Sequence, residues 1–164
     1  MTKKKIEIGA FLPSAGEFPR KYGVNNMAIR LEELGFSSLW VSDHILMPEI
    51  IKADYPFAKD KKATWDTNIA WYDSLILLSM AAAVTKNIKL GTAVLVLPLR
   101  HPIIFAKQAA TIDELSKGRL VLGIGAGWLS DEFDALNVDF KTRGKRFEEW
   151  MNISRNCWTG APKA

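Results

Sequence analysis

The order of the elements along the chain limits the fold more than any other feature of this sequence. From Ile6 to Trp158, an apolar strand-like run is followed by a helix-like segment four times in succession. Apolar strands joined by helical crossovers are typical of a buried parallel sheet. The pattern predicts an α/β fold, either half of a (β/α) barrel or a small open doubly wound sheet. The predicted strands are Ile6–Leu12, Ser38–Ser42, Ile88–Leu95 and Arg119–Ile124, and the predicted helices span about Tyr22–Leu34, Asp73–Thr85, Pro102–Ser116 and Thr142–Trp158.

The composition indicates one folded unit without a membrane segment. The chain has 164 residues, of which 48% are hydrophobic, and we expect a single domain over residues 1–164. No stretch approaches the roughly 18 apolar residues of a membrane span, and no secretory signal follows Met1. The lone cysteine, Cys157, argues against an internal disulfide and a cysteine metal cluster. We therefore expect a cytoplasmic protein with no metal and no membrane partner.

Two charged stretches have simple interpretations. The net charge of +4 is mild, and only Lys3–Lys5 form a tight basic cluster. No aromatic or arginine-rich stripe accompanies this cluster, so we expect a solvated terminus and no nucleic-acid partner. The second stretch, Lys59–Lys62, lies in an irregular insertion from about Ile45 to Trp71. Loops this long are usually functional or mobile, and we expect this one to help select the substrate.

The candidate functional residues follow the predicted strands, because parallel α/β proteins bind ligands beyond the carboxyl ends of their strands. Asp43 and His44 are the best pair, since a histidine exchanges protons near neutral pH and an aspartate accepts hydrogen bonds. The alternative is structural: Asp43 would cap the loop, and His44 would be a satisfied buried imidazole. The other candidates are Phe11, Pro13, Thr92, Ala93, Val94, Gly125, Gly127 and Trp128.

Gly123–Gly127 is similar to a dinucleotide-binding fingerprint, but it lacks the third glycine and the acidic residue that should follow. A tight turn that lets the backbone approach a flat ring suits the run better, because glycine has no Cβ to obstruct it. A doubly wound module that binds a nucleotide phosphate is a weaker alternative. Arg143, Lys145 and Arg146 suit either an anion or solvent.

Several groups of residues occur in the order found in a known family. They are Leu39–His44, Lys89–Val94, His101–Pro102 with Ala106–Gln108, and Gly118–Trp128. Together they resemble the bacterial luciferase-like monooxygenase superfamily. Gly127–Phe133, followed by Arg143–Arg146, is most similar to the branch that uses the deazaflavin coenzyme F-420. The resemblance covers almost the whole chain. It implies a (β/α)8 TIM barrel, of which this chain supplies the N-terminal half with four β-α units.

The resemblance also implies a coenzyme, a substrate class and roles for the candidate residues. The coenzyme would be F-420, or alternatively FMN, with its ring at the carboxyl ends of the strands and a small organic molecule as substrate. His44 would be catalytic, assisting proton transfer at the reactive face, and Asp43 would position the ring or the histidine. The remaining residues would contact the ring: Thr92, Ala93 and Val94, with a non-proline cis peptide at Ala93–Val94, and Gly125, Gly127 and Trp128.

The half-length match leaves two interpretations open. In barrels of this kind, the loops after strands seven and eight hold phosphate groups, and this sequence does not supply those strands. The chain is either a redox enzyme subunit that pairs with a second copy or a second-half chain, or a truncated, non-catalytic half barrel. The sequence stops just after Trp158–Pro162, which resembles the approach to a fifth strand and favours truncation. An open half barrel exposes two strand edges and its interior, so we expect it to associate.

Overall fold

A computed structural model describes residues 6–160, and its sheet has the strand order of a barrel. All pairs are parallel, and the order β1-β2-β3-β4 follows the sequence. A doubly wound sheet reverses its strand order at a switch point, so this sequential order confirms the half-barrel prediction. The basic cluster Lys3–Lys5 lies outside the described residues. The strands are β1 (Gly9–Phe11), β2 (Ser38–Val41), β3 (Lys89–Val96) and β4 (Leu120–Gly125).

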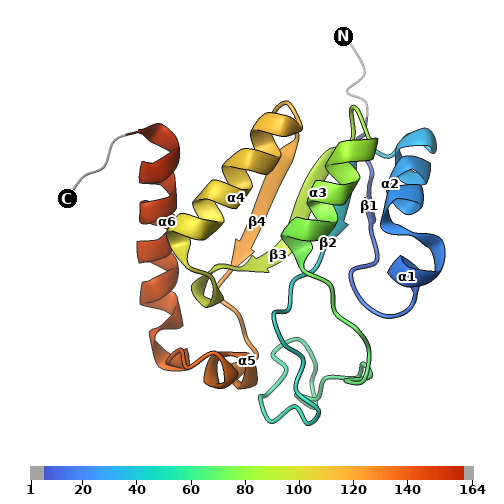
Figure 1. Cartoon of the computed structure of the whole chain (residues 1–164). Helices are drawn as coiled ribbons and strands as arrows, with labels where there is room; N and C mark the ends of the chain where they lie inside the picture. Colours follow the sequence, from blue (N-terminus) through green and yellow to red (C-terminus); the bar gives the residue numbers. More distant parts are fainter. Residues whose placement is uncertain (1–5, 161–164) are drawn as a thin grey trace.

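Four helices follow the strands and cover one face of the sheet (Figure 1). They are α2 (Val24–Glu33), α3 (Ser74–Val84), α4 (Pro102–Leu115) and α6 (Arg143–Thr159). Helix α3 begins where Asp73 accepts hydrogen bonds from the backbone N–H groups of Leu75 and Ile76. Helix α4 begins with Pro102, whose missing N–H costs nothing in a first turn. No helix within residues 6–160 is long and apolar enough to cross a bilayer.

Four short helical segments were not expected from the sequence: α1 (Phe18–Tyr22), η1 (Leu97–Leu99), α5 (Ser130–Ala135) and η2 (Phe140–Thr142). None exceeds six residues, which is too short for an apolar period to identify them. The first predicted helix, about Tyr22–Leu34, is found as α2 but begins at Val24, because Gly23 with a positive φ of 78° separates it from α1.

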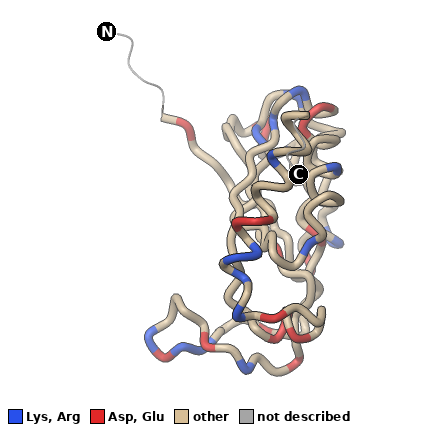
Figure 2. The backbone as a smooth tube through the Cα atoms, turned by 90° about the vertical axis from the view of Figure 1, so that its left-hand side faces the viewer, with Lys and Arg blue, Asp and Glu red and all other residues tan. Residues whose placement is uncertain are grey.

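The two faces of the sheet have different surroundings. Alternate side chains such as Leu39, Val41 and Leu90 point toward the helices and are fully buried. The other face has no layer over it among the described residues, and there Phe11 is 57% exposed and Val94 48% exposed. A side view shows the helices on one side of the sheet and a long segment extending past the other side (Figure 2). The open face is the one that would line the interior of a closed barrel.

A tryptophan lies across the open face over two glycines. A Cβ on Gly91 would come within 2.3 Å of the Trp40 ring, and one on Gly9 within 2.6 Å of Trp40 Nε1. The indole N–H donates to Ser38 Oγ at 2.9 Å. Glycine is therefore required on both neighbouring strands, because any side chain there would displace the indole.

Residues 45–71 form the long irregular segment that the sequence predicts, with turns and bends but no helix or strand. One isolated antiparallel bridge joins its last residue, Trp71, to Ala15. The N–H of Tyr72 donates to the carbonyl of Ser14 at 3.0 Å, and that of Gly16 to Ala70 at 2.9 Å. The end of this segment is thus hydrogen-bonded to the loop that follows β1, at the carboxyl edge of the sheet.

Candidate functional site

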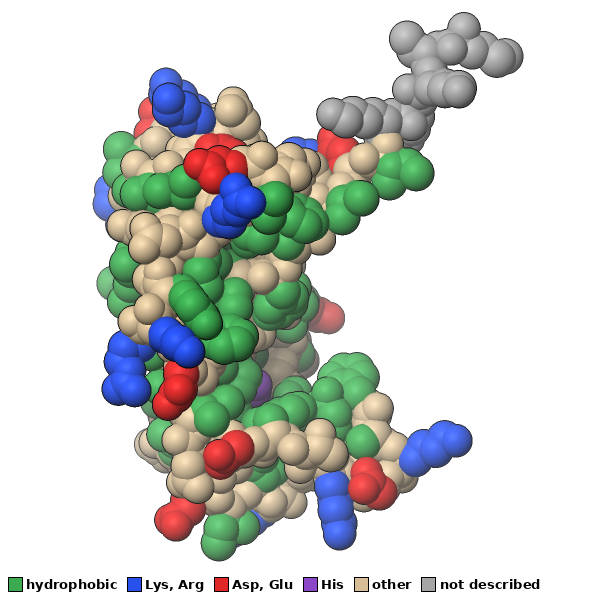
Figure 3. Space-filling model, turned by 90° about the vertical axis from the view of Figure 1, so that its right-hand side faces the viewer, with side chains coloured by type: hydrophobic (Ala, Val, Ile, Leu, Met, Phe, Trp, Pro, Cys, Tyr) green, Lys and Arg blue, Asp and Glu red, His purple; other side chains and the backbone are tan. Residues whose placement is uncertain are grey.

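A cavity of about 690 Å³ lies at the carboxyl ends of the strands. The 45–71 segment projects beside it, and the space-filling view shows the molecule hollowed on this side (Figure 3). The size suits a small organic molecule or the ring of a coenzyme. Most of the candidate residues from the sequence line it, namely Asp43, His44, Ala93, Val94, Gly125, Gly127 and Trp128.

The wall formed by β3 and β4 consists of backbone and small side chains. The Ala93–Val94 peptide is cis, as the family resemblance implies, and the register of β3 against β4 shifts between Thr92 and Leu95. A Cβ on Gly125 would lie 2.8 Å from a methyl of Val94. Gly127 has a φ of +84°, and a Cβ there would lie 2.7 Å from Val96 and 2.9 Å from Phe133. Larger residues at either glycine would fill or distort this wall.

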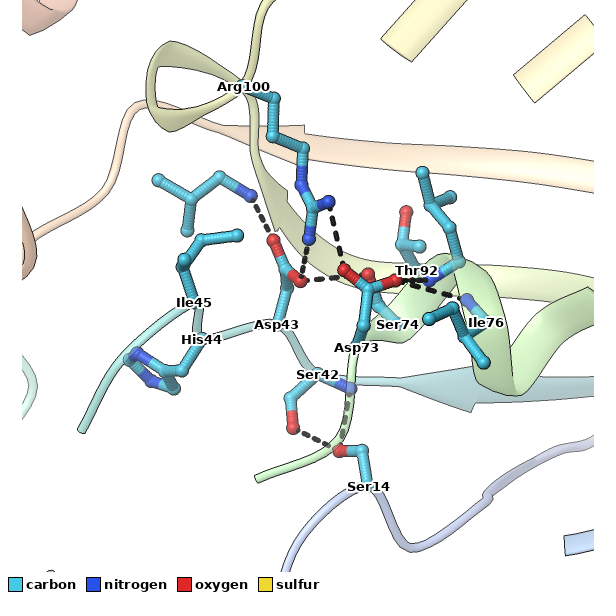
Figure 4. A network of polar contacts seen from close by, with 12 residues as sticks. Ser14, Ser42, Asp43, His44, Ile45, Asp73, Ser74, Ile76, Thr92 and Arg100 are labelled. Carbon is cyan, nitrogen blue, oxygen red and sulfur yellow. Dashed lines mark hydrogen bonds and ion pairs between the residues drawn. The ribbon is translucent and has the colours of Figure 1, made fainter. Parts of the chain in front are cut away.

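Asp43 lines the cavity but is buried, at the centre of a polar network (Figure 4). One carboxylate oxygen accepts from Arg100 Nη2 at 2.7 Å and Ser74 Oγ at 2.8 Å, and the other from the backbone N–H of Val96 at 3.0 Å. Arg100 also pairs with Asp73 at 3.0 Å. Burial alone would lower the pKa of Arg100, but Asp43 and Asp73 together raise that pKa. The carboxylate thus ties β2 to β3 and α3, the loop-holding role weighed for it in the sequence.

His44 points away from Asp43, although the two are neighbours (Figure 4). Its Nδ1 lies 3.0 Å from Oε2 of Glu132, which is 1% exposed on α5. The other oxygen of Glu132 accepts from the backbone N–H groups of Ile45 at 2.7 Å and Leu46 at 3.1 Å. His44 also packs edge-on against Trp71, with ring centroids 4.6 Å apart. The imidazole is thereby fixed at the cavity wall.

Aromatic side chains of the 45–71 segment also line the cavity, namely those of Tyr55, Phe57, Trp65 and Trp71. Tyr55 packs edge-on against both Trp65 and Trp128, with centroids 5.0 Å apart in each pair. Trp128 follows β4, so these contacts connect the segment to the rigid sheet. Asp131 adds a polar connection by accepting from the backbone N–H of Ala53 at 3.1 Å. Part of the segment is therefore held against the rest of the structure.

Three candidates occupy places that differ from the rest. Thr92 is fully buried, donates from Oγ1 to the Gly123 carbonyl at 2.8 Å, and does not line the cavity. Phe11 and Pro13 lie in a separate hollow beside α2.

Within residues 6–160, no three His, Cys, Asp or Glu side chains come together as a metal site requires.

Sequence reasoning missed several residues of the site. Arg100 had a signal, because a buried aspartate at a strand end requires a cationic partner from a nearby loop. Glu132 had a weaker one: it is an acidic residue within Gly127–Phe133, the run that carries the family resemblance after the glycine-rich turn. Arg143, considered only as an anion or solvent contact, reaches the cavity, where its guanidinium stacks 3.8 Å from the centroid of the Phe140 ring. The missed aromatics of the insertion are Tyr55, Phe57, Trp65 and Trp71.

Known proteins of similar sequence are longer than this chain. An uncharacterised protein of Mycobacterium tuberculosis is 37% identical over 134 residues, which are 80% of this chain and 47% of that protein. The F420-dependent glucose-6-phosphate dehydrogenase of Amycolatopsis mediterranei is 33% identical over 136 residues, 80% of this chain and 36% of the dehydrogenase. This chain therefore spans less than half the length of these relatives.

A solved structure extends the likeness to the fold. It is the oxygenating constituent of 3,6-diketocamphane monooxygenase of Pseudomonas putida in complex with FMN. It superposes with a TM-score of 0.69 at 22% identity, over 93% of this chain and 39% of that one. At this identity the likeness concerns the fold alone. The profile of the luciferase-like monooxygenase family matches residues 8–163, and the chain belongs to that family.

Proposed function

We propose that this chain is the coenzyme-ring half of an F-420-dependent oxidoreductase, with FMN as the alternative coenzyme. The observation that carries the proposal is the cavity at the strand ends, which is lined both by His44 and by the small residues Ala93, Gly125 and Gly127. Family membership and a 33% identical F420-dependent relative support it. When bound, such a coenzyme supplies hydride transfer, and the protein orients and shields it.

The residues present fit a flat, largely apolar ring. The backbone of Ala93–Val94 and Gly125 would support one side of it, since a Cβ at Gly125 would approach Val94 to 2.8 Å. His44 would give or take a proton at the edge of the cavity. Tyr55 and Trp65 of the 45–71 segment would exclude water from the part of the cavity that they line.

Asp43 has a supporting role in this proposal. Its oxygens already accept from Arg100, Ser74 and the Val96 N–H, so they hold the strand end that carries His44. We therefore assign it to positioning and keep proton transfer for His44. Thr92 acts similarly, holding the β3 bulge through its bond to the Gly123 carbonyl.

The open sheet face suggests how the chain would work. It exposes Phe11, Val94 and Val121, the last at 37%, where a closed barrel would have its interior. We propose that a polypeptide equivalent to the second half of the relatives covers this face and holds the phosphate-bearing tail of the coenzyme. Pairing of two copies of this chain is the alternative occupant.

The proposal is tested by titrating the purified chain with F-420 and with FMN while its mass in solution is measured. Saturable quenching of coenzyme fluorescence supports binding of the coenzyme ring in the cavity. Tighter binding of F-420 than of FMN supports assignment to the F-420-dependent branch. His44→Ala should leave ring binding within about threefold, because a histidine at the edge contributes little to apolar contact. If neither coenzyme binds, with or without a second-half chain, the proposal is wrong.

A further inference from the structure

The contacts of Glu132 determine which nitrogen of His44 carries the proton. Glu132 is almost fully buried, and within residues 6–160 its carboxylate accepts from two backbone N–H groups and faces one imidazole nitrogen. A carboxylate has only acceptor sites, so the nitrogen that it faces, Nδ1, must carry the hydrogen. In the neutral imidazole this leaves Nε2 without a proton.

Nε2 has no protein partner among the described residues, while His44 lines the cavity. We propose that Glu132 is a positioning residue that holds His44 in the Nδ1–H form and keeps Nε2 available as the proton acceptor at the cavity. The functional meaning rests on the proposed function, in which His44 assists proton transfer. A histidine in the other form presents an N–H at this place and cannot accept a proton there.

The two oxygens of the Glu132 carboxylate have different partners, so the effect of replacing Glu132 by glutamine can be predicted. Oε1 accepts from Ile45 and Leu46, and Oε2 faces His44. In Glu132→Gln, the amide oxygen has to remain on the side of the two backbone donors, since an NH₂ group there would oppose them. The NH₂ group then faces Nδ1 and donates to it. This variant should therefore reverse the protonation of the ring and place the hydrogen on Nε2.

Asp131→Asn provides a matched control on the neighbouring residue. Asp131 accepts hydrogen bonds from the backbone N–H groups of Lys52 and Ala53, so it anchors the 45–71 segment without contacting His44. A change that results only from loosening of the segment would occur in both variants. A change in the protonation of His44 should occur in Glu132→Gln alone.

The experiment is nitrogen NMR of the full chain with labelled histidine, at an alkaline pH where the imidazole is neutral. His101→Gln removes the other histidine signal, and His101 makes no capping bond at the start of α4. We expect Nδ1–H in the unchanged chain and in Asp131→Asn, and Nε2–H in Glu132→Gln. An Nε2–H ring in the unchanged chain overturns the inference even if Glu132→Gln fails to fold, and so does an unaltered ring in a folded Glu132→Gln.

These spectra require no coenzyme, which separates the two proposals. Failure to bind F-420 or FMN would remove the proposed function and leave the ring protonation as measured. Conversely, an Nε2–H ring in a chain that binds the coenzyme would remove only the role of Glu132.

Discussion

At each end of the sheet, a glutamate accepts hydrogen bonds from consecutive backbone N–H groups of a loop. At the amino end, Glu32 of α2 accepts from Asn87 at 2.6 Å and Ile88 at 2.9 Å, just before β3. At the carboxyl end, Glu132 of α5 accepts from Ile45 and Leu46, just after β2. The contact is the same, but its surroundings differ.

The amino end is closed by structural contacts. The guanidinium of Arg119 donates to the carbonyls of Ala82, Thr85 and Ile88. Burial lowers the pKa of Arg119 more than the negative charge of Glu32 raises it. At the carboxyl end, one oxygen of Glu132 is left for His44, and a cavity opens beside the ring. A glutamate that only fastens a loop at the amino end thus has a counterpart at the carboxyl end that also holds an imidazole beside a cavity.

Removing the cation at the carboxyl end should have the largest effect on stability. Arg100→Ala leaves the fully buried Asp43 side chain without its ion-pair partner, and we expect a loss of about 3–5 kcal/mol in the free energy of unfolding. Urea unfolding followed by circular dichroism measures it. Arg30→Ala is the control, because Arg30 pairs with Glu33 on the surface and should cost less than about 1 kcal/mol. Equal losses in the two variants would contradict the distinction between them.

Substitution of two glycines, one at each end of the sheet, should have an intermediate effect on stability. Gly118, before β4, and Gly127, after it, both have positive φ, but only Gly127 lacks room for a Cβ. Gly118→Ala should cost about 1 kcal/mol for its backbone conformation. Gly127→Ala adds contacts with Val96 and Phe133 and should cost about 3 kcal/mol. Thermal unfolding of the two variants side by side measures this. A smaller loss for Gly127→Ala would show that the wall of the cavity yields.

The smallest effect is a pH dependence at the amino end. Partial burial would raise the pKa of Glu32, but hydrogen bonds from Asn87, Ile88 and Lys86 outweigh it and hold the pKa below its ordinary value of 4.5. The carboxylate therefore stabilises the fold above pH 4.5, and this contribution is lost as the pH falls through the lowered pKa. Glu32→Gln should cost about 1–2 kcal/mol at neutral pH.

Urea unfolding at several pH values tests this, with the exposed Glu33→Gln as control. The difference between the unchanged chain and Glu32→Gln should shrink toward zero in acid. A difference that stays constant with pH would mean that the hydrogen bonds do not depend on the charge of Glu32.

Much of the fold and part of the site followed from local patterns. Strand-like runs, the apolar helix-like segments between them and Pro102 in a first turn placed the main elements to within a few residues, apart from the shorter β1. The expectation that ligands bind beyond the carboxyl ends of parallel strands selected His44 and Gly125, which line one cavity. The roles of these residues in catalysis and in binding a coenzyme stay predictions. Helix α5 was missed because six residues are too few to show an apolar period. The partners of Asp43 were missed because they lie far from it in the chain.

The sequence by itself determined the alternation of strands and helices, the edge of the sheet where candidate residues gather, and the family likeness. Only the tertiary structure decided that Asp43 and His44 face different partners, Arg100 on one side and Glu132 on the other. The reason is physical. Periodicity and turn chemistry act within about ten residues, whereas the charge and hydrogen bonding of a buried group depend on residues 57 and 88 positions away in this chain.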